Sequence, residues 1–209
     1  YYILFITGFT LIVFVGLWLT GSASIEKTFR EALFQVVSII TTTGYATTNY
    51  LLWSPVLTLL IFALFFFGGS AGSTGGGIKI MRIVLLIKNS YYELRRILHP
   101  HAVIPIKFNN QSVDAKTITH VLAFFIFYFV IFAISTVIFS LMEPDMPSAM
   151  GAVATCLGNI GPGLGNVGPA ENFLYVEPLG KWFLSFLMLL GRLELFTVLV
   201  LFSPSFWQE

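Results

Sequence analysis

Charged residues, cysteine and histidine are scarce in this chain of 209 residues, and each shortage excludes a class of function. Asp, Glu, Lys and Arg make up 10% of the residues and hydrophobic residues 56%, whereas soluble domains are about a quarter charged. The single cysteine, Cys156, excludes an intrachain disulfide and a cysteine-based zinc site. The chain has no basic block with interleaved aromatics, so nucleic-acid binding is not predicted. The composition therefore predicts a protein embedded in a lipid bilayer.

The chain also lacks the residue clusters that an enzyme needs. No nucleophile, base or metal-ligand set is gathered in the apolar segments. His99 and His101 lie among prolines with no acid or thiol cluster nearby, which favours a linker over a metal site. Residues 75–79 resemble a phosphate-binding loop, but the glycine spacing and the Gly-Lys-Ser/Thr ending of that motif are absent. We therefore expect no enzyme activity and no covalently bound cofactor.

Apolar and polar stretches follow one another in an order that occurs twice. Residues 1–19 are long enough to cross a hydrocarbon core, which takes about 20 helical residues. Residues 28–40 are too short to span and are expected to form a re-entrant helix. A hydroxyl-rich loop follows at 41–48, then a return at 49–55 whose aromatics are expected at headgroup level. Residues 56–67 then descend through the bilayer.

The second half has the same plan. Residues 120–141 form a full span, and the short apolar run 148–156 delivers a second glycine-centred loop at 155–163. Residues 179–202 descend and are interrupted at 191–194. Short apolar segments in matching positions of two halves indicate a binding site between parallel repeats related by an axis along the membrane normal.

The loop at 41–48 offers only hydroxyl and carbonyl oxygens, which replace the hydration shell of an alkali ion. A re-entrant helix before it would direct the partial negative charge of its carboxyl end at a cation. Residues 42–46 are also similar to the Thr-Val-Gly-Tyr-Gly filter of potassium channels. The alternative is an ordinary threonine-rich loop after a helix.

A second loop, at 68–77, consists of ten small residues and interrupts the inner span of the first half. Its unpaired backbone groups would be costly in lipid unless they line a water-filled cavity. We therefore expect a broken, mobile helix. Glycine-rich breaks also occur in secondary transporters that bind a small organic solute, which is the alternative function.

The distribution of charge predicts orientation and domain boundaries. Seven of the eleven basic residues lie between positions 79 and 116, so this connector is expected in the cytoplasm. Acidic residues flank the two pore loops, which are expected near the outer face: Glu143, Asp145, Glu171 and Glu177. The predicted units are a first repeat at 1–97, a cytoplasmic connector at 98–116 and a second repeat at 117–209. The fold class is thus an all-α integral membrane protein with two tandem repeats of helix, re-entrant pore helix and helix.

Four motifs together resemble the Trk/Ktr/HKT superfamily of potassium transporters. They are TTTGY at 41–45, GGSAGSTGGGIK at 68–79, CLGNIGPG at 156–163 and GRLE at 191–194. The resemblance covers essentially all 209 residues. It implies four repeats in a complete protein, of which this chain would hold the third and fourth, forming half of a pseudo-fourfold pore in the bacterial inner membrane. It also implies a homodimer gated by a cytosolic nucleotide-binding ring, with K⁺ as the transported ion.

The resemblance also implies roles for individual residues. The selectivity filter would be formed by Thr42, Thr43, Gly44, Tyr45, Cys156, Leu157, Gly158, Asn159 and Ile160. The gate would be formed by Gly68, Gly69, Gly72, Gly75, Gly76, Gly77, Lys79 and Arg192. An arginine at mid-bilayer costs about 3 kcal/mol on insertion scales, so Arg192 must face water, protein or a counter-charge. Pairing with Glu194 is the structural alternative, but residues two apart on a helix point to different faces.

Overall fold

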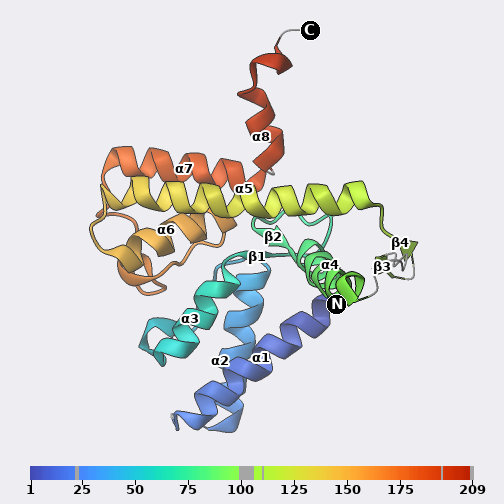
Figure 1. Ribbon diagram of the computed structural model, residues 1–209. Helices are drawn as coiled ribbons and strands as arrows, with labels where there is room; N and C mark the ends of the chain where they lie inside the picture. The colour runs from blue at the N-terminus through green and yellow to red at the C-terminus, as the bar shows by residue number, and fades with distance from the viewer. Residues whose placement is uncertain (22–23, 99–105, 110, 194, 208–209) are drawn as a thin grey trace.

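The computed structural model describes residues 1–209 except 22–23, 99–105, 110, 194 and 208–209. It is a helical structure in which the two halves of the chain occupy separate parts of the molecule (Figure 1). The first half, blue to green, lies below, and the second half, yellow to red, lies above. His99, His101 and Glu194, to which the sequence drew attention, lie outside the described residues.

The described residues of the first half form the helices α1 (Tyr2–Leu19), α2 (Ile25–Ile40), α3 (Pro55–Leu64) and α4 (Ile80–Leu98). α1 packs along α2, and a short 3₁₀ turn, Tyr50–Leu52, leads into α3. Proline in the first turn of α3 starts that helix without losing a helical hydrogen bond. Between α3 and α4, strand β1 (Phe67–Gly68) pairs in parallel with β2 (Ile78–Lys79).

The second half contains α5 (Ala115–Ser140), α6 (Met146–Gly158), α7 (Pro178–Arg192) and α8 (Leu195–Leu201). α6 packs on both α5 and α7. Asp145 caps α6, because its carboxylate accepts from the backbone N–H of Ser148 over 3.1 Å. α8 leaves the end of α7 at an angle of 113° and points away from the other helices (Figure 1). The connector contains a small antiparallel pair, β3 (Lys107–Phe108) and β4 (Gln111–Ser112).

Two of the described helices, α1 and α5, are long and apolar enough to cross a membrane, and the bent pair α7 and α8 would be a third span. An aromatic cluster joins the halves: Phe66, after α3, contacts Tyr128, Phe129 and Phe132 of α5 at ring centroid distances of 5.0–6.3 Å. The all-α membrane fold predicted from the sequence is confirmed, and the order of elements repeats as expected.

Several boundaries differ from the prediction. α2 begins three residues earlier than the expected residue 28, because Ser24 and Glu26 suit a helix N-terminus. α5 begins at Ala115, inside the expected connector, so polar residues form its first turns. Tyr50, in the expected return segment, is fully buried within the protein, and its ring packs 6.4 Å from those of Trp53 and Phe65.

Candidate functional site

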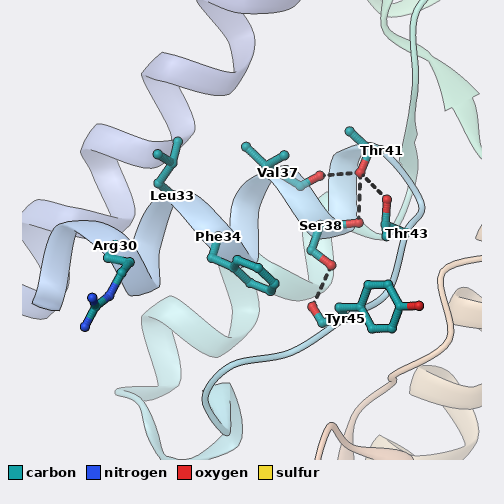
Figure 2. Close-up of a pocket in the computed structure, with 8 residues that line it drawn as sticks. All are labelled: Arg30, Leu33, Phe34, Val37, Ser38, Thr41, Thr43 and Tyr45. Atoms are coloured by element: carbon teal, nitrogen blue, oxygen red, sulfur yellow. Dashed lines mark hydrogen bonds between the residues drawn. The ribbon is translucent and has the colours of Figure 1, made fainter.

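The first pore loop follows α2 and is held by hydroxyls of that helix (Figure 2). Ser38 Oγ donates to the backbone oxygen of Tyr45 over 2.6 Å. Thr41 Oγ1 lies 2.8 Å from Thr43 Oγ1, within hydrogen-bond distance. The loop therefore leaves the carboxyl end of α2 in a defined conformation, with backbone and hydroxyl oxygens concentrated where the helix end is partially negative.

The second pore loop follows α6 and is held in a similar way. Gly161 N donates to Thr155 Oγ1 over 2.9 Å, and Ile160 N donates to the backbone oxygen of Thr155 over 3.0 Å. Asn159 Nδ2 donates to the carbonyl of Met188 on α7 over 2.9 Å. This loop is thus anchored to two helices of its own half.

The two loops share a backbone pattern. A non-glycine residue with positive φ is followed, two residues later, by a glycine with positive φ: Thr42 (56°) and Gly44 (77°) in the first, Asn159 (55°) and Gly161 (121°) in the second. By backbone conformation, the counterpart of Gly44 is therefore Gly161, 117 positions later. The prediction that Gly158 centres the second loop is wrong, because Gly158 is the last residue of α6.

Cys156 and Leu157, also predicted in this loop, lie inside α6, with 4% and 0% of their surface exposed. α6 continues past them because its C-cap is Asn159 in the left-handed conformation, which asparagine tolerates better than most residues. Of the predicted filter residues in the second half, Asn159 and Ile160 are the two that the structure places in the loop.

The two loops meet directly. A side chain on Gly44 would overlap the carbonyl oxygen of Ile160 and would lie 3.2 Å from Cδ of Pro162. Gly44 also has a φ of 77°, so both the lack of room for a Cβ and the backbone conformation require glycine at this position. Segments more than 110 residues apart thus bring their backbones into contact at one place.

The glycine-rich loop at 68–77, expected to be a break in the helix, makes several hydrogen bonds of its own. The pairing of β1 with β2 closes its base, and Ile80 N donates to Gly69 O over 3.3 Å. The ammonium of Lys79, 8% exposed, donates to Ser73 O over 2.8 Å, to Ser73 Oγ over 3.0 Å and to the carbonyl of Gly75. A single lysine side chain therefore binds the middle of the loop.

Two glycines of this loop lie against the pore loops. A Cβ on Gly75 would lie 2.7 Å from Thr42 Oγ1, and one on Gly76 would overlap the carbonyl oxygen of Gly158. The absence of side chains at 75 and 76 therefore allows the loop to approach the ends of both α2 and α6. Gly72, in contrast, has a φ of 81° and open space around it, as a turn requires.

A polar cavity of about 360 Å³ lies where these segments converge. It is lined by Tyr2, Thr41, Thr42, Gly69, Ser70, Ser73, Thr74, Gly75 and Arg192. The exposed Arg192, the last residue of α7, faces the same cavity as Thr42 of the first pore loop. The structure thus brings together predicted filter and gate residues from three separate segments.

Thr43 and Tyr45 lie on another side of the first loop, where a second pocket of about 420 Å³ runs along α2 (Figure 2). The pocket lining combines the two with Thr41, which follows α2, and with one face of that helix, formed by Arg30, Leu33, Phe34, Val37 and Ser38. Leu33, Phe34 and Val37 give this pocket an apolar wall, while its hydroxyls come from the residues next to the first loop. Within the described residues, no group of three or more His, Cys, Asp or Glu side chains gathers as a metal site.

The anchors Ser38 and Thr155 were not predicted as functional residues. Their position in the last turns of the two pore helices was the available signal, because hydroxyls there can reach the backbone of the following loop. Tyr50, whose hydroxyl donates to the carbonyl of Gly163 over 2.7 Å, gave no comparable signal.

Comparison with known proteins supports the same architecture. The potassium transporter TrkH from Vibrio parahaemolyticus has a crystal structure that matches this chain with a TM-score of 0.90 at 40% identity, covering 98% of this chain and 44% of that one. The Trk system potassium uptake protein TrkH of Escherichia coli K12 is 43% identical over 204 residues, and TrkG of the same strain is 29% identical over 209.

These relatives are longer than the chain. The match to TrkH from Escherichia coli K12 covers 96% of this chain but 42% of that protein, and the match to TrkG covers 43% of TrkG. The sequence also matches a protein family over residues 1–209, and that family is described as TrkH, cation transport protein. Its members are transporters and not enzymes. The chain therefore belongs to the TrkH family of cation transport proteins.

Proposed function

We propose that this chain is part of a potassium uptake protein and supplies two of the four repeats around its ion path. The observation that carries the proposal is the meeting of two pore loops, at Gly44 and Ile160, together with a polar cavity that Thr41 and Thr42 share with a glycine-rich loop and Arg192. Potassium uptake is the activity named for the relatives TrkH and TrkG. The repeats are 1–97 and 117–209, joined by the connector 98–116.

In this proposal, K⁺ is bound by oxygen atoms of the two pore loops. Thr42, Thr43, Gly44 and Tyr45 supply the first set, and residues 159–161 supply the second. Backbone carbonyls and hydroxyls replace the hydration shell of the ion, and the carboxyl ends of α2 and α6 favour its positive charge. Gly161 takes the place of Gly158 here, because its backbone matches that of Gly44.

The gate lies directly below, in the cavity of about 360 Å³. The loop at 68–77 obstructs the path, and Arg192 repels a cation in a narrow place where few waters screen its charge. The loop joins α4 and then the basic connector, so a cytosolic partner bound to the connector could bias the loop. That partner is proposed to be a nucleotide-binding regulatory ring, acting on a homodimer in the bacterial inner membrane.

The test is rubidium uptake, with the protein expressed from its complete gene in bacteria that lack their own potassium uptake systems. We expect uptake above the empty-vector control, competed by added K⁺ and poorly by Na⁺. Uptake of Rb⁺ that fails to exceed the control, with the protein present in the membrane, would refute the proposal. Uptake of a labelled organic solute driven by an ion gradient would support the secondary-transporter alternative instead.

A further inference from the structure

Tyr50 connects the return segment of the first half to the pore loop of the second. Its side chain is 0% exposed, and its hydroxyl donates to the backbone oxygen of Gly163 over 2.7 Å, across 113 positions of sequence. Gly163 lies two residues after Gly161, the glycine whose backbone matches Gly44. The hydrogen bond therefore fixes the far end of the loop that is proposed to hold K⁺.

Tyr50 is itself held firmly. Its backbone oxygen accepts from Thr58 Oγ1 of α3 over 3.1 Å and from Trp53 N over 3.2 Å. Its ring makes edge contacts with Trp53 and Phe65, each at 6.4 Å between centroids. A side chain with this many contacts has little rotational freedom, so its hydroxyl is a fixed point for Gly163.

Gly163 is also confined by its own half. Its N–H donates to Val167 O over 2.6 Å, and a Cβ on it would lie 2.9 Å from the carbonyl oxygen of Gly151 in α6. The loop between 159 and 163 is thus fastened at Gly161 by Thr155 and at Gly163 by Tyr50. Of these two side chains, Tyr50 comes from the other half of the chain.

We propose that Tyr50 is a specificity-determining positioning residue, whose hydroxyl sets the position of the second pore loop relative to the first. The proposal rests on the proposed function. Discrimination between K⁺ and Na⁺ requires carbonyls at fixed separations or with a fixed number of ligands. A glycine-containing loop with no side-chain packing at Gly161 cannot hold its carbonyls in place without fastening at its ends.

The test compares Tyr50→Phe with Tyr128→Phe in the complete protein. Both variants remove one buried phenolic hydroxyl, since Tyr128 is 1% exposed. The hydroxyl of Tyr128 has no hydrogen-bond partner among the described residues, so its loss breaks no bond that they make. Phenylalanine keeps the ring contacts in each case, which makes the pair a matched control.

We expect Tyr50→Phe to lower the ratio of K⁺ to Na⁺ transport by roughly three- to tenfold, the range set by the net contribution of one hydrogen bond. The maximal Rb⁺ uptake should change little. Amide hydrogen exchange in a peptide covering 159–167 should become faster in Tyr50→Phe and stay unchanged in Tyr128→Phe. The exchange measurement reports how firmly the loop is held, without depending on transport.

Faster exchange together with the lowered ratio would support the proposal. An unchanged transport ratio in Tyr50→Phe, at equal protein amount and thermal stability, would overturn it, whether or not exchange changes. An equal fall in the ratio for both variants would also overturn it, because the loss of any buried hydroxyl would then explain the lowered ratio. A wild-type protein that carries no K⁺ or Rb⁺ would instead refute the proposed function.

Discussion

Replacing Lys79 with methionine should release the glycine-rich loop and raise ion flux. The ammonium of Lys79 makes three hydrogen bonds to the loop, two to Ser73 and one to Gly75. Methionine has a similar length and no donor, so all three bonds are lost while the side chain still fills its space. The pairing of β1 with β2, which closes the base of the loop, is unaffected.

The size of the effect follows from these contacts. Hydrogen bonds from a charged donor contribute about 1.5–3 kcal/mol each. The full sum is not expected, because Ser73 and Gly75 line the polar cavity, where water can replace the ammonium. Removing a buried charge also removes its desolvation cost. We therefore expect the free energy that holds the loop in place to fall by about one such bond, 1.5–3 kcal/mol. This shifts the loop equilibrium toward the released state roughly 10- to 150-fold.

Amide hydrogen exchange measures that equilibrium directly, because local opening controls the exchange of protected amides. The amides of Ser73, Ile78 and Ile80 each donate within the loop region and are covered by one peptide. Lys116→Met is the control, since it removes an exposed lysine far along the chain from the loop. Rb⁺ flux without the regulatory partner is measured in parallel. Equal exchange and equal flux in Lys79→Met and Lys116→Met would refute the idea that Lys79 holds the loop closed.

Three further predictions concern the filter, the charge below it and the orientation. Gly44→Ser should reduce K⁺ selectivity in Rb⁺ and Na⁺ uptake assays, because the new side chain displaces the Ile160 carbonyl and adds about 1–2 kcal/mol of backbone strain. Unchanged selectivity would remove Gly44 from the filter. Arg192→Ala should raise flux at equal protein amounts, since a positive charge leaves the cavity; no rise would place the barrier elsewhere. An impermeant thiol reagent on intact cells should label Asn172→Cys and spare Lys116→Cys, and the reverse would invert the proposed orientation.

The order of elements could be predicted from the sequence because the length of an apolar run decides whether it spans. α1 and α5 have enough residues to cross a hydrocarbon core, whereas α6 has 13 and does not. The sequence also predicted that the loop at 68–77 lines a cavity, because irregular backbone at membrane depth is costly in lipid, and Gly69 and Gly75 do line the polar cavity. These inferences depend on local composition, which the sequence displays directly.

The alignment of the two pore loops could not be predicted in the same way. Gly158 and Gly161 are three positions apart, and both are followed by polar or small residues. The choice depends on where α6 ends, which is decided by the left-handed conformation of Asn159. Asparagine adopts that conformation in some helix ends and not in others, so composition does not fix it. A matching pair of glycines was therefore a weaker guide than the backbone angles around them.

Composition also could not reveal which hydrogen bonds hold the loops in place. Tyr50 was expected among the interfacial aromatics. Lys79 was expected among the basic residues that determine orientation and, through the family resemblance, in the gate. Both are buried and donate to backbone oxygens. The pore loops and the glycine-rich loop have few apolar side chains, so hydrophobic packing cannot fix them and single polar side chains from neighbouring segments do so. Because the two side chains bind different loops, Tyr50 should affect which ion passes and Lys79 should affect how often the path is open. Sequence composition cannot assign such roles, since each depends on which carbonyl the donor reaches.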